Sequence, residues 1–414
     1  MNFCKAGVAL AIPAPTRSLF NEVSSTLSFR IHRDLASAAT DWKKVEPADN
    51  RFLQLDYLRV LEEHPPQGMD FVYLLFYQGD EPVGIAYCQL LDFNAGRSLQ
   101  PSAEVLRSNR WEAWKSWFRQ LVAQRVEFRM LICGNALLTG PNGFYFRPDL
   151  VGQEEAFRSL EKALSRTESL LEEEGYAPGA VLIKDVPFEQ RSRTKAWKKQ
   201  GLQEIEFLPS MYMPLDRSWR TFDDYLGALS SKYRVRARRA FRLSDDVCCR
   251  EWDLETIRAR EDDLQRLYCE VVDRAEFNMV HLGEGYFSGL KERLGEQYRC
   301  YAYCEQERLL GFFTTLDNGE ELEAHFLGFD PTENTRQQLY LNMLFDMVRL
   351  GIEQGYRRIH FARTAMEIKS SVGAVPQRLF SYFRHRNWLS NRMLGILNGF
   401  LEPAVEWQPR HPFK

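Results

Sequence analysis

The sequence predicts an α/β protein with two related halves, each a mixed, mostly antiparallel sheet flanked by helices. Two apolar hairpins support this prediction, one over residues 71–89 and one over 299–316, each with two strand-like runs around a polar turn. Gly84 and Gly311 occupy corresponding positions just inside the second strand of each hairpin. The matching hairpins indicate a duplicated unit.

The order of elements after each hairpin strengthens the repeat. In both halves an extended segment and an amphipathic helix lead to a Gly-Tyr pair, at 175–176 and at 355–356, and then to another apolar strand. Glycine adopts the left-handed conformation that ends a helix at little cost, so each pair predicts a helix end. The first half is longer, and we expect an extra helix over 103–125 to account for this. The alternative is that such elements recur here by chance.

The length of 414 residues favours two domains over a single core. Residues 188–201 are rich in Lys, Arg and Gln, which is typical of an exposed connector or surface helix. We therefore expect a loosely ordered leader, an N-terminal domain, a C-terminal domain with the active site, and a tail, over residues 1–27, 28–195, 196–402 and 403–414.

Charge and cysteine content narrow the expected partners and compartment. The chain has 54 Lys and Arg against 57 Asp and Glu, so a nucleic-acid or membrane partner needs a local basic patch. Its eight cysteines lack C-x-x-C spacing, which favours free thiols in a reducing cytoplasm. The sequence has no apolar run of about 20 residues, and we expect no integral membrane segment. The scattered histidines predict no metal site, and fingerprints of P-loop, Rossmann, zincin and G-x-S-x-G enzymes are absent.

A basic helix is predicted over 225–242, where apolar residues recur at helical spacing. The remaining positions are cationic: Lys232, Arg234, Arg236, Arg238, Arg239 and Arg242. Guanidinium groups bind phosphate oxygens in bidentate fashion, so this helix is a candidate contact for a phosphate group or an RNA backbone. The alternative is a solvated helix face.

The segment 320–329 alternates as a strand, which places Glu321, Glu323 and His325 on one face. Acylation of an amine needs a base to remove a proton from the attacking ammonium, and a carboxylate or imidazole at a strand end can do this. Glu323 and His325 are therefore the leading candidates for the base. The alternative is a sheet face that is simply solvated.

A second group of candidates follows the apolar strand at 358–363. His360, Glu367 and Lys369 lie at or just after its end, where open α/β sheets often place a site wall. Glu367 and Lys369 are also candidates for a structural ion pair. Tyr382, in a run interpreted as helical after Pro376, is a candidate general acid, with simple packing as the alternative.

These elements resemble a known superfamily. A hairpin, a strand, a helix and a further strand follow the order of the acyl-CoA N-acyltransferase (GNAT) fold, and two such units in tandem resemble the Fem-type aminoacyl transferases of bacterial cell-wall synthesis. The local likeness is carried by 225–242, by 267–290 and by the E-x-K-x-x-x-G stretch at 367–373, within a likeness that covers roughly 205–385. The resemblance implies that two strands of the sheet diverge and leave a slot between them. It also implies that the strand with Glu323 and His325 supplies the general base, and that a tyrosine such as Tyr382 acts as the general acid.

The sequence departs from typical GNAT enzymes where they bind the pyrophosphate of coenzyme A. The corresponding segment, 329–339, has no glycine, so an aminoacyl-tRNA donor fits this resemblance better than acetyl-CoA. We expect transfer of an acyl or aminoacyl group from a thioester or tRNA ester to a primary amine, on a small-molecule or lipid-linked acceptor, with no firmly implied cofactor. One alternative keeps acyl-CoA as the donor, with Arg336 holding the phosphates. Another is a non-catalytic binding protein of the same fold.

Overall fold

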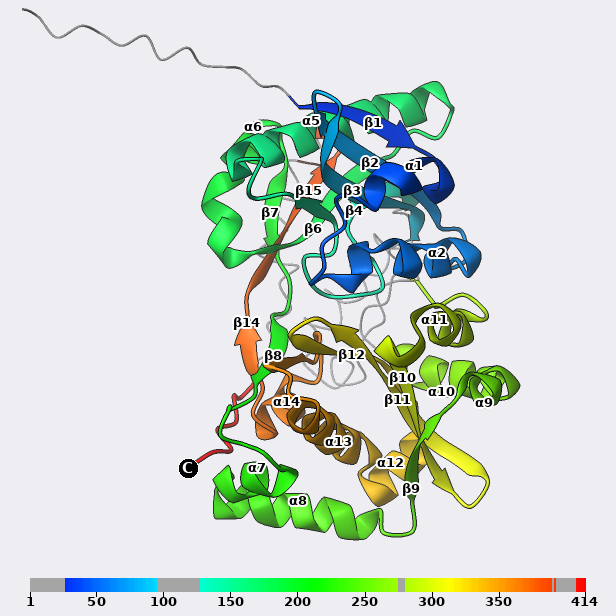
Figure 1. Cartoon of the computed structure of the whole chain (residues 1–414), viewed down its shortest axis with the longest axis vertical. Helices are drawn as coiled ribbons and strands as arrows, with labels where there is room; N and C mark the ends of the chain where they lie inside the picture. The colour runs from blue at the N-terminus through cyan, green and yellow to red at the C-terminus, as the bar shows by residue number, and fades with distance from the viewer. Residues whose placement is uncertain (1–26, 95–126, 275–279, 389–390, 392–406) are drawn as a thin grey trace, which may run out of the picture.

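The computed structural model describes residues 27–94, 127–274, 280–388, 391 and 407–414 (Figure 1). Nearly all of the predicted leader, and the predicted helix over 103–125, lie outside these residues. The chain forms two sheets flanked by helices, one above the other in Figure 1. Within the described part, no helix is both long and apolar enough to cross a membrane.

The N-terminal sheet has the strand order β1-β2-β3-β4-β6-β15-β7, with β5 paired to β3. Its strands are β1 (Ser28–His32), β2 (Asp70–Gln78), β3 (Glu81–Asn94), β4 (Glu127–Cys133), β5 (Phe144–Phe146), β6 (Ala180–Pro187), β7 (Gln203–Glu206) and β15 (Leu379–His385). The helices of this half are α1 (Leu35–Trp42), α2 (Leu55–Glu63), α5 (Gln153–Glu173) and α6 (Lys195–Lys199), with 3-10 turns at Arg51–Leu53 and Phe188–Arg193.

Both faces of this sheet are buried, which explains why β2 is apolar almost throughout. Tyr73 and Leu75 pack in the cluster that contains α1 and α2, whereas Val72 and Leu74 pack in the cluster that contains α5. Successive side chains of a strand point to opposite faces, so a sheet covered on both sides needs apolar residues at every position.

The C-terminal sheet has the order β14-β8-β13-β12-β11-β10-β9. Its strands are β8 (Ser210–Pro214), β9 (Cys248–Trp252), β10 (Tyr298–Glu305), β11 (Arg308–Asn318), β12 (Glu321–Phe329), β13 (Arg358–His360) and β14 (Val375–Gln377). Residues of α7 (Phe222–Ala228), α8 (Ser231–Leu243), α13 (Leu339–Glu353) and α14 (Met366–Ser371) pack in one cluster, next to the short α12 (Pro331–Gln337). The opposite face of the sheet packs in a second cluster, with residues of α9 (Leu254–Ala259), α10 (Glu261–Val272) and α11 (Tyr286–Leu294). A 3-10 turn at Gly295–Gln297 follows α11.

The predicted duplication is confirmed down to the register of the hairpins. The β2–β3 pair has a bulge next to Phe76–Gly84, and the β10–β11 pair has a bulge next to Tyr303–Gly311. Each glycine also faces a side chain, Phe146 or Met343, that lies too close to leave room for a Cβ atom.

The two helix ends also match. α5 and α13 are each followed by a glycine with positive φ, +82° at Gly175 and +75° at Gly355. In both cases the next residue, Tyr176 or Tyr356, donates its N–H to a carbonyl five residues earlier, and the glycine donates to a carbonyl three residues earlier. These paired bonds define a Schellman cap, for which glycine is the preferred residue.

Sheet membership does not follow a single boundary near residue 195. β7 still belongs to the N-terminal sheet, the chain crosses to the other sheet before β8, and β15 returns to lie between β6 and β7. The segment around Tyr382, interpreted as helical from the sequence, is therefore a strand. Residues 379–383 of this strand are all buried in the N-terminal sheet, and its partner strands β6 and β7 precede it by more than 170 residues.

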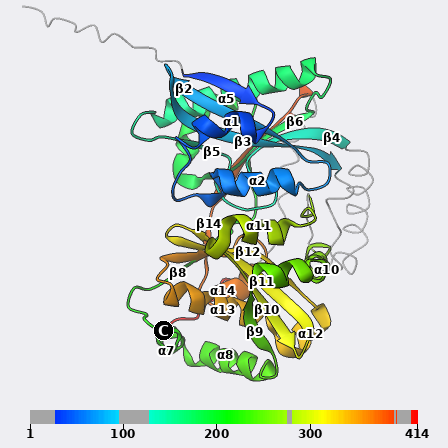
Figure 2. The same cartoon turned by 45° about the vertical axis from the view of Figure 1, so that its right-hand side comes forward.

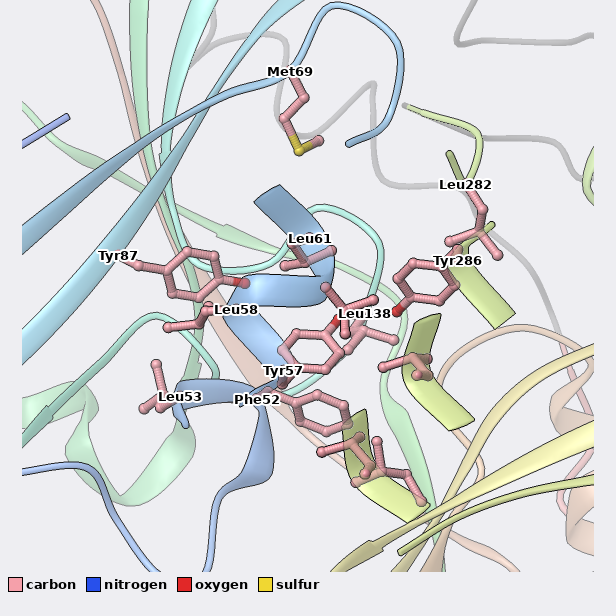
Figure 3. Packing of buried hydrophobic residues seen from close by; sticks show 14 of the residues in the cluster. Phe52, Leu53, Tyr57, Leu58, Leu61, Met69, Tyr87, Leu138, Leu282 and Tyr286 are labelled. Carbon is pink, nitrogen blue, oxygen red and sulfur yellow. Dashed lines mark hydrogen bonds between the residues drawn. The ribbon is translucent and has the colours of Figure 1, made fainter. Parts of the chain in front are cut away.

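The two halves share one buried core where α2 packs beside α11 (Figure 2). Phe52 and Tyr57 meet edge to face, with ring centroids 5.0 Å apart, and the hydroxyl of Tyr57 lies 3.2 Å from that of Tyr286. Figure 3 shows these rings with Leu138 and Leu282 around them. Because this joint is buried and closely packed, it holds the surfaces between the halves in fixed positions.

Candidate active site

The site begins where β12 and β13 separate. These parallel strands pair at only three positions, which end with Glu323 opposite His360. β12 then continues to Phe329, whereas the chain after His360 turns toward α14. The strands therefore diverge beyond this pair, as the resemblance to the GNAT fold implies.

Glu323, His360 and Ser210 form a line of hydrogen bonds across three neighbouring strands. The Nδ1 atom of His360 lies 2.6 Å and 2.8 Å from the two carboxylate oxygens of Glu323, and its Nε2 atom lies 2.5 Å from Oγ of Ser210. With Glu323 ionised, Nδ1 donates to the carboxylate and Nε2 accepts from the serine hydroxyl. All three side chains are buried, so the imidazole is held in one orientation and one tautomer.

A pocket of about 100 Å³ opens beside this line, between the two halves. Its N-terminal wall consists of two loops, with Asp49, Asn50 and Phe52 from one and Thr139, Gly140, Pro141 and Asn142 from the other. Its C-terminal wall consists of Tyr212, Asn318, Glu321, Glu323, Arg358 and His360. Ser210 does not line the pocket and is fully buried, so it contacts His360 from the side away from the pocket.

The pocket carries more negative than positive charge. Asp49, Glu321 and Glu323 face it, and the described lining has one cation, Arg358, which is paired with Glu321. Burial raises the pKa of Glu323, while His360 beside it opposes this rise. A buried carboxylate with a raised pKa accepts a proton more readily than an exposed one, and the surplus of carboxylates favours a cationic amine.

An ionic cluster behind the pocket ties its walls together. Asp185 accepts from Arg363, with Nη2 2.6 Å from Oδ1, and from the backbone N–H of Gly140 at 3.0 Å; it also pairs with Lys184. Although burial opposes it, Arg363 and Lys184 keep the pKa of Asp185 below its usual value. Gly140 belongs to the pocket wall and Arg363 follows His360 by three residues, so Asp185 fixes one side of the site relative to the other.

Backbone strain is concentrated at the same place. Asp185 has a φ of +60°, and the segment after His360 has positive φ at Ala362 (+55°), Thr364 (+66°) and Ala365 (+46°). Non-glycine residues adopt this region only when the surrounding structure enforces it, and such strain clusters at functional sites. The turn after β13 is therefore built for a fixed geometry.

His325, the other predicted base, lies on the same side of the sheet but does not line the pocket. Its Nε2 atom lies 3.1 Å from the hydroxyl of Tyr286, and its ring stacks with Phe52. Burial lowers its pKa to about 3, which keeps the imidazole neutral. A bulge in β12 opposite Thr314 breaks the strict alternation expected from sequence. The geometry gives His325 a place in the core between the halves and does not support it as the base.

The remaining candidates from the C-terminal segment do not meet at the pocket. Glu367 pairs with Arg410, at 2.9 Å, and not with Lys369. The interpretation of Glu367 and Lys369 as a structural ion pair is therefore wrong. Lys369 is buried and donates to the carbonyl of Arg363 at 2.5 Å; burial lowers its pKa to about 7. Tyr382 contacts Thr194, which precedes α6, and Glu204 on β7, and these contacts do not support it as the general acid.

The predicted phosphate-binding residues fall into two groups. Lys232, Arg234, Arg238 and Arg239 lie on α8, at the end of the C-terminal half that is farthest from the N-terminal sheet (Figure 1). Arg336 lies on α12 and is already paired with Glu305 and Glu333. Of the predicted binding residues, only His360 lines the pocket.

The start of α12 corresponds to the segment that binds the coenzyme A pyrophosphate in the GNAT enzymes that the sequence resembles, and here side chains of the protein occupy it. The carboxylate of Asp330 accepts from the backbone N–H groups of Thr332 and Glu333, at 2.8 Å and 3.2 Å. Arg308 pairs with both Asp330 and Glu333. The amides and cations that would bind phosphate are therefore satisfied by carboxylates.

Sequence reasoning missed Ser210, Tyr212 and the two loops of the N-terminal half. Tyr212 stacks on His360, with ring centroids 4.3 Å apart, and its strand begins with Ser210. The pairing of β8 with β13 brings these residues to His360, and this pairing has no local sequence signal. The loop residues are of types found in any turn, so they carried no signal either.

A larger hollow of about 280 Å³ lies beside α10, with Glu261, Asp262 and Glu284 among its lining residues. Glu261 accepts from the backbone N–H groups of Phe287 and Ser288 at the start of α11. Because this carboxylate caps a helix and no predicted catalytic residue lines the hollow, we place the site at the pocket between the halves.

Comparison with known proteins finds a family match within the C-terminal half and fold likenesses over most of the chain. Residues 231–370 match the family model described as the acetyltransferase (GNAT) domain. The solved structure of FemX aligns with a TM-score of 0.50 and 9% identity, covering 89% of this chain and 100% of that one. A tandem GNAT protein from the clavulanic acid biosynthesis pathway aligns with a TM-score of 0.46 and 11% identity, over 87% of this chain and 99% of that one. L-PGS from Bacillus licheniformis aligns with a TM-score of 0.42 and 10% identity, over 84% and 95%. The search of curated proteins gave no significant match.

Residues 231–370 of the C-terminal half therefore match a GNAT acetyltransferase domain, and this match supports an acyltransferase as the coarse class of the protein. As a whole, the chain is similar in fold to FemX.

Proposed function

We propose that the protein transfers an acyl or aminoacyl group from an ester or thioester donor to a primary amine, with Glu323 as the general base. The observation that carries this proposal is the hydrogen-bonded line Glu323–His360–Ser210 at the point where β12 and β13 diverge, beside a pocket rich in carboxylates.

The acceptor amine fits the pocket by size and charge. At roughly 30 Å³ for each water-sized group, the volume suits an ammonium group and its first carbon atoms. Asp49 and Glu323 attract the ammonium, and Asn50 and Asn142 offer further polar atoms. The pocket therefore limits the acceptor to a narrow chain next to its amine, whether the acceptor is a small molecule or the end of a lipid-linked chain.

The reaction then follows from the position of Glu323. The carboxylate takes a proton from the ammonium, and the free nitrogen attacks the donor carbonyl to form a C–N bond. The C–O or C–S bond of the donor breaks, and the alcohol or thiol leaves with a proton. His360 holds the Glu323 carboxylate through Nδ1, and Ser210 holds His360 through Nε2, so both act as positioning residues.

A donor other than coenzyme A is favoured by the capped start of α12. Because Asp330 occupies the amides and Arg336 is paired with Glu305 and Glu333, a pyrophosphate would have to displace three carboxylates. The likeness to Fem-type proteins points instead to a tRNA ester.

The test is an amide-forming assay with the full chain and three donors: aminoacyl-tRNA, acetyl-CoA and a long-chain acyl-CoA, each with a set of primary amines. Mass spectrometry detects the amide, and thermal shift reports donor binding, because a ligand that binds only the folded state raises the Tm. We expect amide formation from the tRNA ester. Transfer from acetyl-CoA alone would support the coenzyme A alternative, and binding of a donor without any amide would support a non-catalytic protein.

A further inference from the structure

The outer face of α8 is cationic along its whole length. Lys232, Arg236, Arg239 and Arg242 recur at intervals of three or four residues, so they share one side of the helix, with Arg238 at its margin. All five are exposed, and none forms a salt bridge with any residue that the structure describes. Arginines elsewhere on the surface are mostly paired, as Arg336 is with Glu305. These cations are thus available to bind an anionic partner.

Two aliphatic side chains project from the same basic face. Val235 is 66% exposed and lies between Lys232 and Arg239, whereas Leu243 is 41% exposed and follows Arg239 and Arg242 at the end of the helix. Exposure of a large aliphatic group to water is unfavourable, and its transfer into an apolar medium lowers the free energy. Their place among the cations therefore points to a partner with both negative charge and an apolar interior.

The opposite face fixes the helix to the body of the domain. Ala237 and Ala240 are fully buried, and the amide of Asn342 donates to the carbonyl of Ala240 at 3.1 Å. Tyr233 and Phe241 pack against the same core. The aromatic rings of α8 therefore face inward, and none is left on the basic face for stacking on nucleic-acid bases.

We propose that α8 lies flat on an anionic phospholipid surface, with its cations among the headgroup phosphates and Val235 and Leu243 at the boundary of the acyl chains. A helix of 13 residues presents a strip of roughly 20 Å, and Figure 1 shows it along the outer edge of the molecule, where a flat surface can reach it. An RNA backbone offers the phosphates but no apolar layer for the two aliphatic side chains. This proposal concerns binding and stands apart from the acyl-transfer chemistry.

The test is co-sedimentation of the full chain with vesicles of phosphatidylglycerol and phosphatidylcholine in about equal amounts, and with phosphatidylcholine alone. We expect binding only to the anionic vesicles, weakened by salt. Each headgroup-bound cation contributes roughly fivefold in affinity, so K232Q/R236Q/R239Q/R242Q should bind at least about 100-fold more weakly. The matched control is R158Q/K162Q/K195Q/K199Q, which removes four exposed cations of the N-terminal half that have no salt bridge among the described residues.

A second variant separates a membrane from RNA. V235S/L243S keeps every charge and should bind anionic vesicles about tenfold more weakly, because aliphatic insertion is lost. Circular dichroism melts check that each variant is folded. The proposal is overturned if the chain does not bind anionic vesicles, if it binds both kinds of vesicle equally, or if the α8 and control variants behave alike. Tight tRNA binding that only the α8 charge variant loses, without vesicle binding, would assign the surface to RNA instead.

Discussion

The neutral, buried His325 makes the stability of the protein depend on pH in a way that can be calculated. Its pKa is about 3 in the folded state and about 6.5 in an unfolded chain. Below about pH 6.5 the unfolded state therefore binds a proton that the folded state does not bind. The stabilising contribution is complete above pH 6.5 and is lost progressively as the pH falls toward 3.

The size of the loss follows from the two pKa values. Between about pH 7.5 and pH 5, proton binding to the unfolded imidazole lowers the free energy of unfolding by about 2 kcal/mol. His325 is almost fully buried, so solvent screening does not reduce this figure much. Other histidines with lowered pKa, His32 and His385, add their own smaller pH dependence.

The measurement is urea unfolding at both pH values, for the natural chain and for His325→Gln. The glutamine keeps an amide that can bond to Tyr286 and cannot titrate, and it leaves His32 and His385 in place. We expect the variant to lose about 2 kcal/mol less than the natural chain between the two pH values. Equal losses in the two proteins would refute the buried, neutral state of His325.

Three further predictions follow from single contacts. Ser210→Ala removes the partner of Nε2 on His360, so the ¹⁵N shifts of that imidazole should change toward a mixture of tautomers; unchanged shifts would show that the hydroxyl does not set the tautomer. Asp185→Asn keeps a residue that tolerates positive φ but leaves Lys184 and Arg363 without a carboxylate, so denaturant unfolding should show that the free energy of unfolding falls by about 3–5 kcal/mol. The control is Asp92→Asn, at the exposed pair with Arg129, which should lower it by at most about 1 kcal/mol. Similar losses in the two variants would contradict the role of the buried cluster. Gly175→Ala and Gly355→Ala should each lower the free energy of unfolding by about 1 kcal/mol, because the positive φ is strained for alanine although nothing lies within 4 Å of the added Cβ atom. Gly227→Ala, inside α7 with the same free space, should not destabilise the protein. Unequal losses at Gly175 and Gly355 would argue against equivalent helix ends.

The duplicated fold could be predicted from sequence because its signals are local. Each hairpin is a continuous run of residues, and each helix end is marked by a glycine at Gly175 or Gly355. The alternation around Glu323 likewise placed that carboxylate on a strand face, where the structure has it. Patterns of this kind depend on residues that are close in sequence, so they can be recognised without knowledge of the tertiary structure.

The rest of the site depends on pairings between distant segments. Tyr382 was misread as helical because its strand is stabilised by β6 and β7, which lie far away in the sequence. Ser210 reaches His360 only because β8 pairs with β13. The bulge that leaves both His325 and Phe326 opposite Thr314 comes from the register of β11 and β12, which has no signal in the local sequence.

We propose that Glu323, and not His325, takes the proton from the amine. The most direct measurement compares kcat/KM for amide formation in Glu323→Gln and His325→Gln, with the donor and amine that the natural chain uses. Loss of a general base costs about 10²–10⁴-fold, so Glu323→Gln should fall within that range while His325→Gln stays within a few fold of the natural chain at neutral pH. A fully active Glu323→Gln, or a loss confined to His325→Gln, would contradict the account.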